Sequence, residues 1–170
     1  MISGQPHFRF NPGAYETGRS FEKSAEICDV CQSSCGWKYT GSIYALQRPT
    51  VCADCIANGN LTQFMDDRHF SLHDIELSGA SSELETEVLQ RTPGVACFNP
   101  FDWPVLDSKP MQFIGYGEDQ RVLSNPDAQL AIEEAFVKAD GEYELQTPTS
   151  YALVFKEISG DRYRAVIDLD

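Results

Sequence analysis

The stretches Cys28-Asp-Val-Cys31 and Cys52-Ala-Asp-Cys55 decide the fold of the N-terminal third of this chain. Twenty residues separate the two Cys-x-x-Cys pairs, which is the long end of the spacing found in four-thiolate zinc sites. Two residues between thiolates let one tight turn supply two corners of a tetrahedron, and the second pair supplies the other two. The pattern therefore predicts one structural Zn²⁺ ion, with no coordination position left for a substrate.

The cysteines also permit other interpretations. Soft thiolates suit iron–sulfur clusters, and four buried or redox thiols without metal are a further alternative. Cys35 can compete as a ligand, but it would break the symmetry of the two pairs. Cys97 stands alone among apolar neighbours, which is typical of a buried small hydrophobe rather than a nucleophile. His69 and His73 lie in a segment rich in Asp and Ser, which favours a loop over a metal site.

The composition is that of an ordinary globular protein. The chain has 170 residues, of which 42% are hydrophobic and 23% charged. This length allows one large domain or a small metal module joined to a second one. No apolar run approaches the roughly 20 residues of a membrane-spanning helix, and the N-terminus lacks the pattern of an export signal. We therefore expect a cytoplasmic protein that does not insert into membranes.

The net charge of −13 is unevenly distributed. Residues 1–60 carry equal numbers of basic and acidic side chains, whereas residues 61–170 carry 8 basic and 21 acidic ones and hence the entire net charge. Such a field repels phosphate backbones, so nucleic-acid binding is not expected. The acidity has two interpretations: it keeps the protein soluble, or it forms a surface for a basic protein partner.

The N-terminal part shows few regular periods. Residues 2–25 are rich in Gly, Pro and aromatic side chains, which predicts an extended arm laid over the core. Residues 37–46 are aromatic and β-branched around Thr40-Gly41-Ser42, which predicts a hairpin. The second cysteine pair leads into a short helical turn that Gly59 can stop.

The C-terminal part carries clearer signals. A capping-box arrangement at Ser82-Glu83-Leu84-Glu85 predicts a helix that ends at Thr92-Pro93. Asn125-Pro126-Asp127 predicts a second helix, residues 125–139, with Leu130, Ala131, Glu134 and Val137 at helical spacing on its buried side. Two apolar runs around Ser159-Gly160-Asp161 predict a terminal hairpin.

These elements predict an α+β fold. Residues 1–65 form a treble-clef-like four-cysteine zinc module with its arm, residues 66–82 a linker or covering loop, and residues 83–170 an acidic α+β module that ends in a β-hairpin. The sequence contains no nucleophile elbow, phosphate loop, dinucleotide fingerprint or His-Glu-x-x-His motif. We therefore expect a protein that is not an enzyme.

A further series of motifs runs along the chain: Phe8-Arg-Phe-Asn-Pro, Thr17-Gly18, the two cysteine pairs with Ile56-Ala-Asn-Gly59, Tyr39-Thr-Gly-Ser-Ile-Tyr44, Arg91-Thr-Pro-Gly94, Trp103 and Phe113-Ile-Gly115. These motifs resemble those of the CbrC family, small bacterial proteins named for a colicin-tolerance protein, and the resemblance covers most of the chain. The resemblance implies a second cysteine set in the C-terminal half. Asp107, Met111 and residues 155–160 stand in its place here, so we expect the terminal hairpin to be held by packing instead of metal.

The resemblance and the charge distribution together predict a toxin-neutralising, immunity-like protein that binds a basic nuclease-type toxin or toxin domain. Nuclease toxins need basic surfaces to hold phosphates, and an acidic protein can occupy such surfaces. A regulatory or adaptor zinc protein in an envelope-stress response is the alternative, and the oligomeric state stays open. The acidic residues expected to be exposed and to bind the partner are Glu118, Asp119, Asp140, Glu142 and Glu144.

Overall fold

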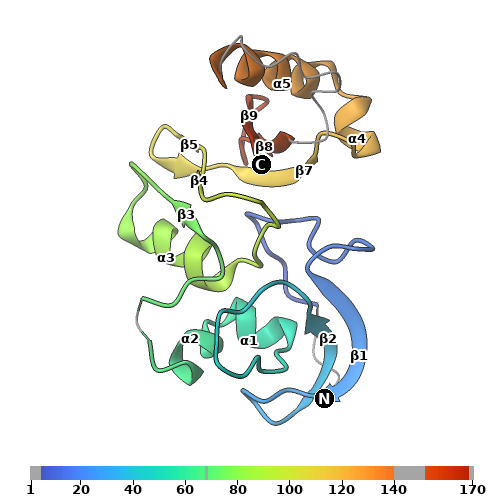
Figure 1. Cartoon of the computed structure of the whole chain (residues 1–170), viewed down its shortest axis with the longest axis vertical. Helices are drawn as coiled ribbons and strands as arrows, with labels where there is room; N and C mark the ends of the chain where they lie inside the picture. The colour runs from blue at the N-terminus through green and yellow to red at the C-terminus, as the bar shows by residue number, and fades with distance from the viewer. Residues whose placement is uncertain (1–4, 68, 140–151, 169–170) are drawn as a thin grey trace. The chain divides into compact units, whose positions relative to one another are not determined.

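The structure is a computed structural model that describes residues 5–67, 69–139 and 152–168. The chain forms two compact units (Figure 1). The first comprises residues 1–73 and 81–96, and the second comprises residues 74–80 and 97–170. The chain therefore enters the second unit briefly, returns to the first for one helix, and then completes the second.

The boundaries of these units differ from the predicted module boundaries at residues 65 and 83. The segment expected to be a linker, residues 66–82, contributes to both units, and the helix after it belongs to the first unit. Phe70, Leu72 and His73 of this segment are buried. Independent folding of the two modules stays a prediction.

The first unit is built on a two-stranded antiparallel ribbon. Strand β1 (Phe21–Ile27) pairs with β2 (Ser34–Tyr39), with Phe21 opposite Tyr39 and Ile27 opposite Ser34. The hairpin predicted at residues 37–46 is wrong, because the chain reverses at residues 28–33, around the first cysteine pair. The backbone N–H of Tyr39 donates to the carbonyl of Val51 at 2.8 Å. The segment around Val51 therefore takes the place of the second strand of the predicted hairpin.

Three helices complete the first unit. They are α1 (Ala53–Ala57), α2 (Asn60–Phe64) and α3 (Ser82–Arg91). Gly59 separates the first two in a left-handed conformation with φ 72°, which confirms the stop predicted there. The hydroxyl of Ser81 accepts the N–H of Leu84, so α3 is capped one residue earlier than predicted.

Aromatic side chains of the N-terminal arm fill one side of the first unit. The rings of Phe8 and Phe21 stack with centroids 5.5 Å apart, and Tyr15 stacks on Phe21 at 4.9 Å. Phe8 and Phe10 are almost fully buried, so the arm is part of the core. This confirms that the arm lies over the core, although its last residues form β1.

The second unit centres on a three-stranded antiparallel sheet in the order β7-β8-β9. Its C-terminal pair confirms the predicted terminal hairpin. Short elements precede and join these strands. In chain order the unit contains β3 (Ile75–Glu76), β4 (Phe101–Asp102), β5 (Val105–Leu106), β6 (Lys109–Pro110), β7 (Gln112–Tyr116), α4 (Gln120–Leu123), α5 (Pro126–Ala139), β8 (Ala152–Lys156) and β9 (Tyr163–Ile167).

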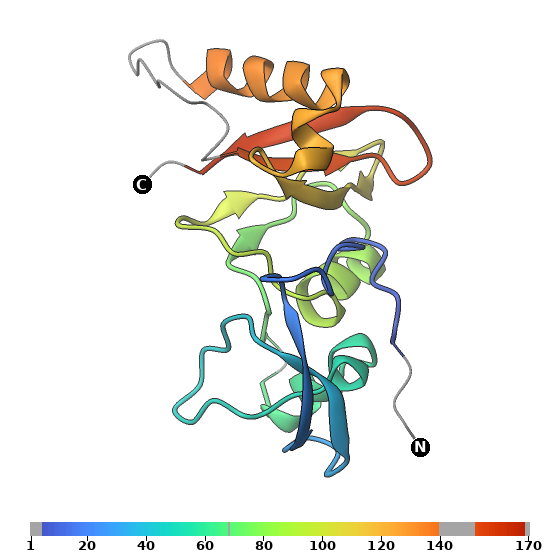
Figure 2. The ribbon, with the colours of Figure 1, turned by 90° about the vertical axis from the view of Figure 1, so that its right-hand side faces the viewer.

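The sheet is buried on both faces, as the continuous apolar run of β8 requires. Ala152 and Val154 face α5, which lies across the sheet in Figure 2. Phe155 points to the other face, where its ring meets Trp103 edge-on at 5.0 Å and Phe113 at 5.6 Å. Successive residues of a strand alternate between faces, so this one strand joins two clusters.

Helix α5 begins as predicted, but of the four residues predicted on its buried side only Ala131 is buried. The side-chain oxygen of Asn125 accepts the N–H groups of Asp127 and Ala128. Ala128 and Ile132 are buried against the sheet, whereas Leu130 is 53% exposed and Val137 is 82% exposed. No helix among the described residues is long and apolar enough to cross a membrane.

Candidate metal centre

The first cysteine pair lies in the turn between β1 and β2. The N–H of Cys28 donates to the carbonyl of Ser33 at 2.8 Å, and the N–H of Gln32 donates back to the carbonyl of Cys28 at 2.8 Å. Gln32 adopts a left-handed conformation with φ 57°, which is uncommon for a residue other than glycine. The turn therefore carries none of the glycine signal by which hairpins are usually recognised.

The second pair opens helix α1. Cys52 is the N-cap residue, and its carbonyl accepts the N–H groups of Cys55 and Ile56. The strand-like segment before it is tied to the first turn, because the N–H of Thr50 donates to the Asp29 carboxylate at 2.6 Å and the Asp29 N–H donates to the Thr50 carbonyl at 2.8 Å. These bonds hold the two cysteine turns against each other.

The four Sγ atoms of Cys28, Cys31, Cys52 and Cys55 all lie within 4.8 Å of one another. The pairs Cys28–Cys55 and Cys31–Cys52 are each 3.8 Å apart. A zinc–sulfur bond of about 2.3 Å gives a tetrahedron whose edges are about 3.8 Å. The cluster therefore fits one tetrahedrally coordinated ion, and its members come from both Cys-x-x-Cys pairs, as the sequence indicated.

The electrostatics of the four thiols also suit a cation. Burial raises the pKa of Cys52 to about 12 and raises the pKa of Cys55 as well. At Cys31, burial has the same tendency, but a backbone hydrogen bond from Ser33 and bonds from the neighbouring thiols outweigh it and lower the pKa to about 7. Four thiolates at this separation would repel one another, and a bound divalent cation would offset that repulsion and let all of them ionise.

Exposure of the ligands is uneven. Cys28, Cys52 and Cys55 are buried, whereas Cys31 is exposed. Four thiolates fill a tetrahedron and leave no position for a substrate or an activated water, which is the arrangement of a structural site. Among the described residues, no other group of three or more His, Cys, Asp or Glu side chains is close enough to share an ion.

The remaining cysteines and histidines lie outside this cluster. Cys35 is fully buried, and burial together with the charges of Cys28 and other neighbours raises its pKa to about 11. Cys97 is half-buried in the second unit. His69 is exposed and His73 is buried, so the two do not form a matched pair.

The predicted partner-binding acids are only partly described. Glu118 is exposed. Asp119 is half-buried, and its carboxylate accepts the N–H of Tyr116 at 2.6 Å, so part of its capacity is used within its own turn. Asp140, Glu142 and Glu144 lie outside the described residues.

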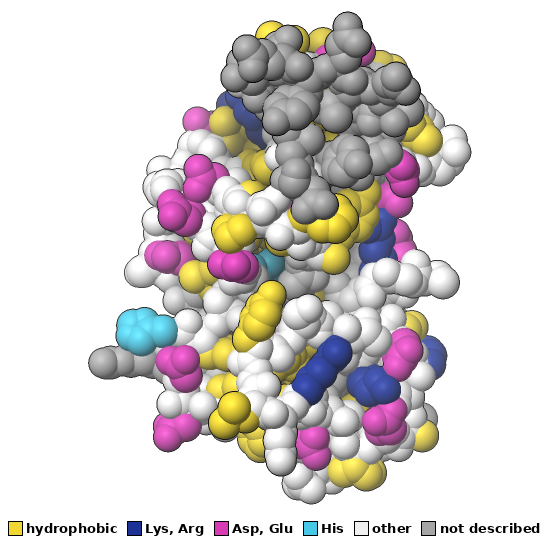
Figure 3. All heavy atoms as spheres, in the orientation of Figure 1, with side chains coloured by type: hydrophobic (Ala, Val, Ile, Leu, Met, Phe, Trp, Pro, Cys, Tyr) yellow, Lys and Arg dark blue, Asp and Glu magenta, His cyan; other side chains and the backbone are white. Residues whose placement is uncertain are grey.

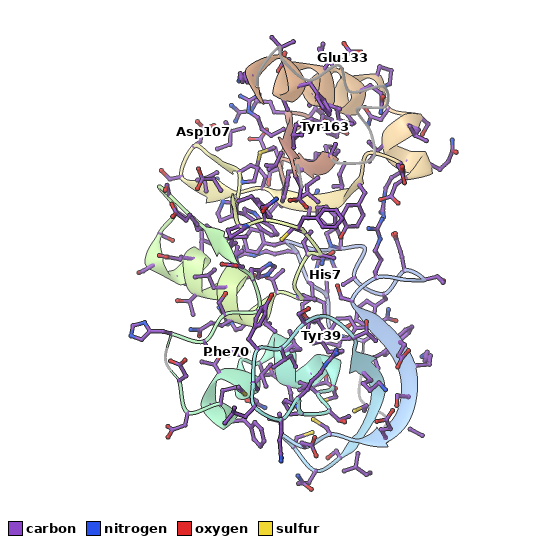
Figure 4. The ribbon with its side chains drawn as sticks, viewed as in Figure 1. His7, Tyr39, Phe70, Asp107, Glu133 and Tyr163 are labelled. Atoms are coloured by element: carbon purple, nitrogen blue, oxygen red, sulfur yellow. The ribbon has the colours of Figure 1, made fainter. Side chains whose placement is uncertain are left out.

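Residues that replace the second cysteine set meet in the second unit. Asp107 lies in the β5–β6 turn (Figure 4), and its carboxylate pairs with Arg162 at 2.5 Å. Arg162 also donates to both carboxylate oxygens of Glu157, at 3.0 and 2.7 Å. Met111 is almost fully buried. An ion-pair network through Arg162 thus joins Asp107 to Glu157, which stand in two of the regions at which the resemblance implied cysteines.

The Asp168 carboxylate makes a contact in the second unit that no sequence motif indicated. Asp168 is buried, and its two carboxylate oxygens accept the N–H groups of Phe98 at 2.6 Å and Asn99 at 2.9 Å. Its partners lie about 70 residues away in the sequence, so spacing alone cannot reveal the contact. The Asp29 carboxylate makes a similar contact in the metal centre, where it accepts one N–H group, that of Thr50.

The fold and the cysteine cluster define an α+β protein with an N-terminal site that suits a single metal ion. The model of the family described as "Uncharacterised protein family (UPF0167)" matches residues 5–159. The chain belongs to this family.

Relatives of this chain include proteins of Pseudomonas and Mycobacterium. A UPF0167 protein of Pseudomonas aeruginosa is 36% identical over 108 residues, which cover 59% of this chain and 57% of that protein. UPF0167 proteins of Mycobacterium bovis and Mycobacterium tuberculosis are each 26% identical over 133 residues, covering 77% of this chain and 71% of theirs. The match thus spans little more than half the length of the Pseudomonas relative. No solved structure matches this chain.

Proposed function

We propose that this chain is a non-enzymatic protein-binding protein, stabilised by one structural Zn²⁺ ion, that captures a basic protein of the nuclease-toxin type. Zinc is favoured among metals because its structural sites are tetrahedral, with four protein ligands that are often thiolates and no open position. The ion would be held by Cys28, Cys31, Cys52 and Cys55 and would supply folding free energy to the first unit.

The exposed side of α5 is the observation that carries the partner proposal. Asp127 and Glu134 are exposed and lie seven residues apart on one side of the helix, and Leu130 and Val137 accompany them at the same spacing. Figure 4 shows Glu133 on the side of α5 that faces away from the sheet. Exposed apolar side chains between carboxylates suit a partner whose own surface combines basic and apolar groups.

The described acidic residues outside α5 are arranged differently from those on its outer side. On the face drawn in Figure 3, the described acidic side chains are scattered among hydrophobic and uncharged ones. Asp107, Glu157 and Asp161 are engaged by Arg162 or Lys156. The outer side of α5 carries Asp127, Glu133 and Glu134 against one basic side chain, Lys138, and Glu118 and the predicted acids beyond residue 139 would add to this negative charge.

Binding kinetics against purified basic nuclease domains test the proposal. A double charge reversal, Asp127→Lys with Glu134→Lys, should reduce the association rate at least about tenfold at low salt, and rising salt should slow the wild type toward the variant. Asp74→Lys with Glu76→Lys reverses two exposed acids of the same unit away from α5 and is the matched control.

Binding that ignores both salt and the α5 reversal would contradict the proposal. Inhibition of nuclease activity by the wild-type protein, but not by the α5 charge-reversal variant, would support the toxin-neutralising role. The resemblance to the CbrC family also favours this role. Salt-sensitive binding to a basic protein without inhibition of any nuclease would favour the regulatory or adaptor role instead.

A further inference from the structure

A small cavity of about 160 Å³ lies in the first unit, away from the cysteine cluster. Its walls come from the N-terminal arm, from the end of α1 and from the last turns of α3. Two arginines and a histidine contribute to them, with a single carboxylate. The lining residues are His7, Phe8, Arg9, Ala57, Glu87, Arg91 and Thr92.

The single carboxylate is already used. Arg9 binds Glu87 through two bonds, Nε to Oε1 at 2.6 Å and Nη2 to Oε2 at 2.5 Å. Arg91 reaches the same Oε2 only at 3.9 Å, which is beyond hydrogen-bond distance. The geometry of a bidentate pair leaves Glu87 with little capacity for a second guanidinium.

Arg91 consequently keeps its donors. Its Nε atom is buried and has no hydrogen-bond partner among the described residues. A buried, unpaired N–H of a cation is costly, and such groups in native proteins call for an explanation. The Arg91 side chain as a whole is 39% exposed, so the guanidinium has a buried Nε atom and also reaches solvent.

The aliphatic stem of Arg91 lies beside Gly59. A Cβ added at Gly59 would be in ordinary contact with it, 3.4 Å from Cγ and 3.6 Å from Cδ of Arg91. Next to the cavity, the side-chain nitrogen of Asn11 donates to the carbonyl of Pro93 at 3.2 Å, which ties the N-terminal arm to the segment that follows α3.

The end of α3 would ordinarily oppose an anion, because the carboxyl end of a helix carries partial negative charge. Here two carbonyls of α3 and that of its C-cap accept further hydrogen bonds: Glu87 O accepts the hydroxyl of Thr92, Leu89 O accepts the N–H of Leu72, and Thr92 O is hydrogen-bonded by His73. These bonds reduce the negative potential next to the arginines.

We propose that this cavity binds a small oxyanion, of the size of one phosphate or carboxylate group, through the guanidinium of Arg91. A planar guanidinium with unused N–H groups matches the oxygens of either ion. Arg9 and His7 line the same space and add positive charge or a donor. The volume is below the range of pockets that hold drug-sized molecules, which limits the ligand to one such group.

Titration of the intact protein with inorganic phosphate and, separately, with acetate tests the proposal at constant ionic strength. Amide chemical shifts of Ala57 and of residues 87–92 should change saturably with at least one of the two. Saturation by phosphate alone identifies a phosphate-type ligand, and saturation by acetate alone identifies a carboxylate. The absence of a saturable change with either ion would overturn the proposal.

Three variants assign the binding to this cavity. Arg91→Met keeps the stem against Gly59 but removes the donors, and it should weaken binding at least about tenfold, the worth of one charge-assisted hydrogen bond. Glu87→Gln removes the competing carboxylate and should strengthen binding several-fold. Arg164→Met removes an exposed arginine of the second unit and should leave the anion affinity unchanged. If Arg91 only stabilises the end of α3, Arg91→Met will lower stability without changing anion affinity, and the proposal fails.

Discussion

The backbone N–H of Cys52 donates to the Sγ atom of Cys28 at 3.4 Å, so the residue that opens α1 also touches the ligand in the β1–β2 turn. The bond joins the two cysteine turns independently of any metal.

Cysteine variants should separate ligands from bystanders. Cys28 and Cys35 are both fully buried, so Cys28→Ser and Cys35→Ser are matched in burial and chemistry. Purified wild-type protein should hold about one zinc per chain, because four-thiolate sites bind zinc tightly. Cys28→Ser and Cys52→Ser should lose the metal and unfold residues 26–60, while Cys35→Ser and Cys97→Ser keep it. Metal analysis with circular dichroism measures both effects, and zinc-free wild type would refute the site.

His73 should make the first unit sensitive to acid. Its ring is buried, with Nε2 3.1 Å from the carbonyl of Thr92, and burial lowers its pKa from 6.5 to about 4. The unfolded chain therefore binds this proton at a higher pH than the folded chain. The stabilising contribution is complete above about pH 6.5, and about 3 kcal/mol of it is lost as the pH falls through 4.

Urea unfolding of zinc-saturated protein between pH 7 and pH 4 measures this loss. Protonation of the cysteine ligands lowers the stability of every variant alike. The variants are therefore compared by the slope of the free energy of unfolding against pH. His73→Gln should show a shallower decline than wild type, while His69→Gln, an exposed control, should match wild type. Parallel curves for wild type and His73→Gln would refute the assignment.

Some features were predictable because their signals are local. The cysteine spacing, the cap at Asn125 and the turn near Gly160 each depend on a few neighbouring residues, and the α+β class follows from them. The buried side of α5 was not predictable in this way. Leu130 and Val137 repeat at helical spacing as well as Ala128 and Ile132 do, and only the sheet decides which side packs.

The misplaced hairpin has a similar cause. Gly41 is a strong turn signal, yet the chain reverses through Gln32, whose left-handed backbone is held by the hydrogen bonds of the cysteine turn. Likewise, Glu87, Arg9 and Arg91 carry no motif as a set. Their cavity exists because the arm and α3, nearly eighty residues apart in the sequence, pack together.

Packing, more than the ion-pair network, should hold the terminal hairpin. Phe155 is completely buried among Trp103 and Phe113, so Phe155→Ala should lower the free energy of unfolding of the second unit by about 3–5 kcal/mol. Arg162 is exposed, so Arg162→Gln should leave the urea midpoint close to that of wild type despite its bonds to Asp107 and Glu157. Equal destabilisation by the two substitutions would mean that the charge network is essential.

Removal of the metal should act on the first unit before the second. The cysteine cluster draws its ligands only from residues 28–55, whereas α5, β8 and β9 form a separate core around Val154 and Ile132. In hydrogen exchange, a chelator should therefore remove the protection of β1, β2 and α1 first, while amides of α5 and of the β8–β9 hairpin stay protected. Adding zinc back should restore the lost protection, and Cys28→Ser should reproduce the chelated pattern without chelator. Simultaneous loss of protection in both units would show that they fold as one cooperative domain and would contradict the two-module organisation predicted from the sequence.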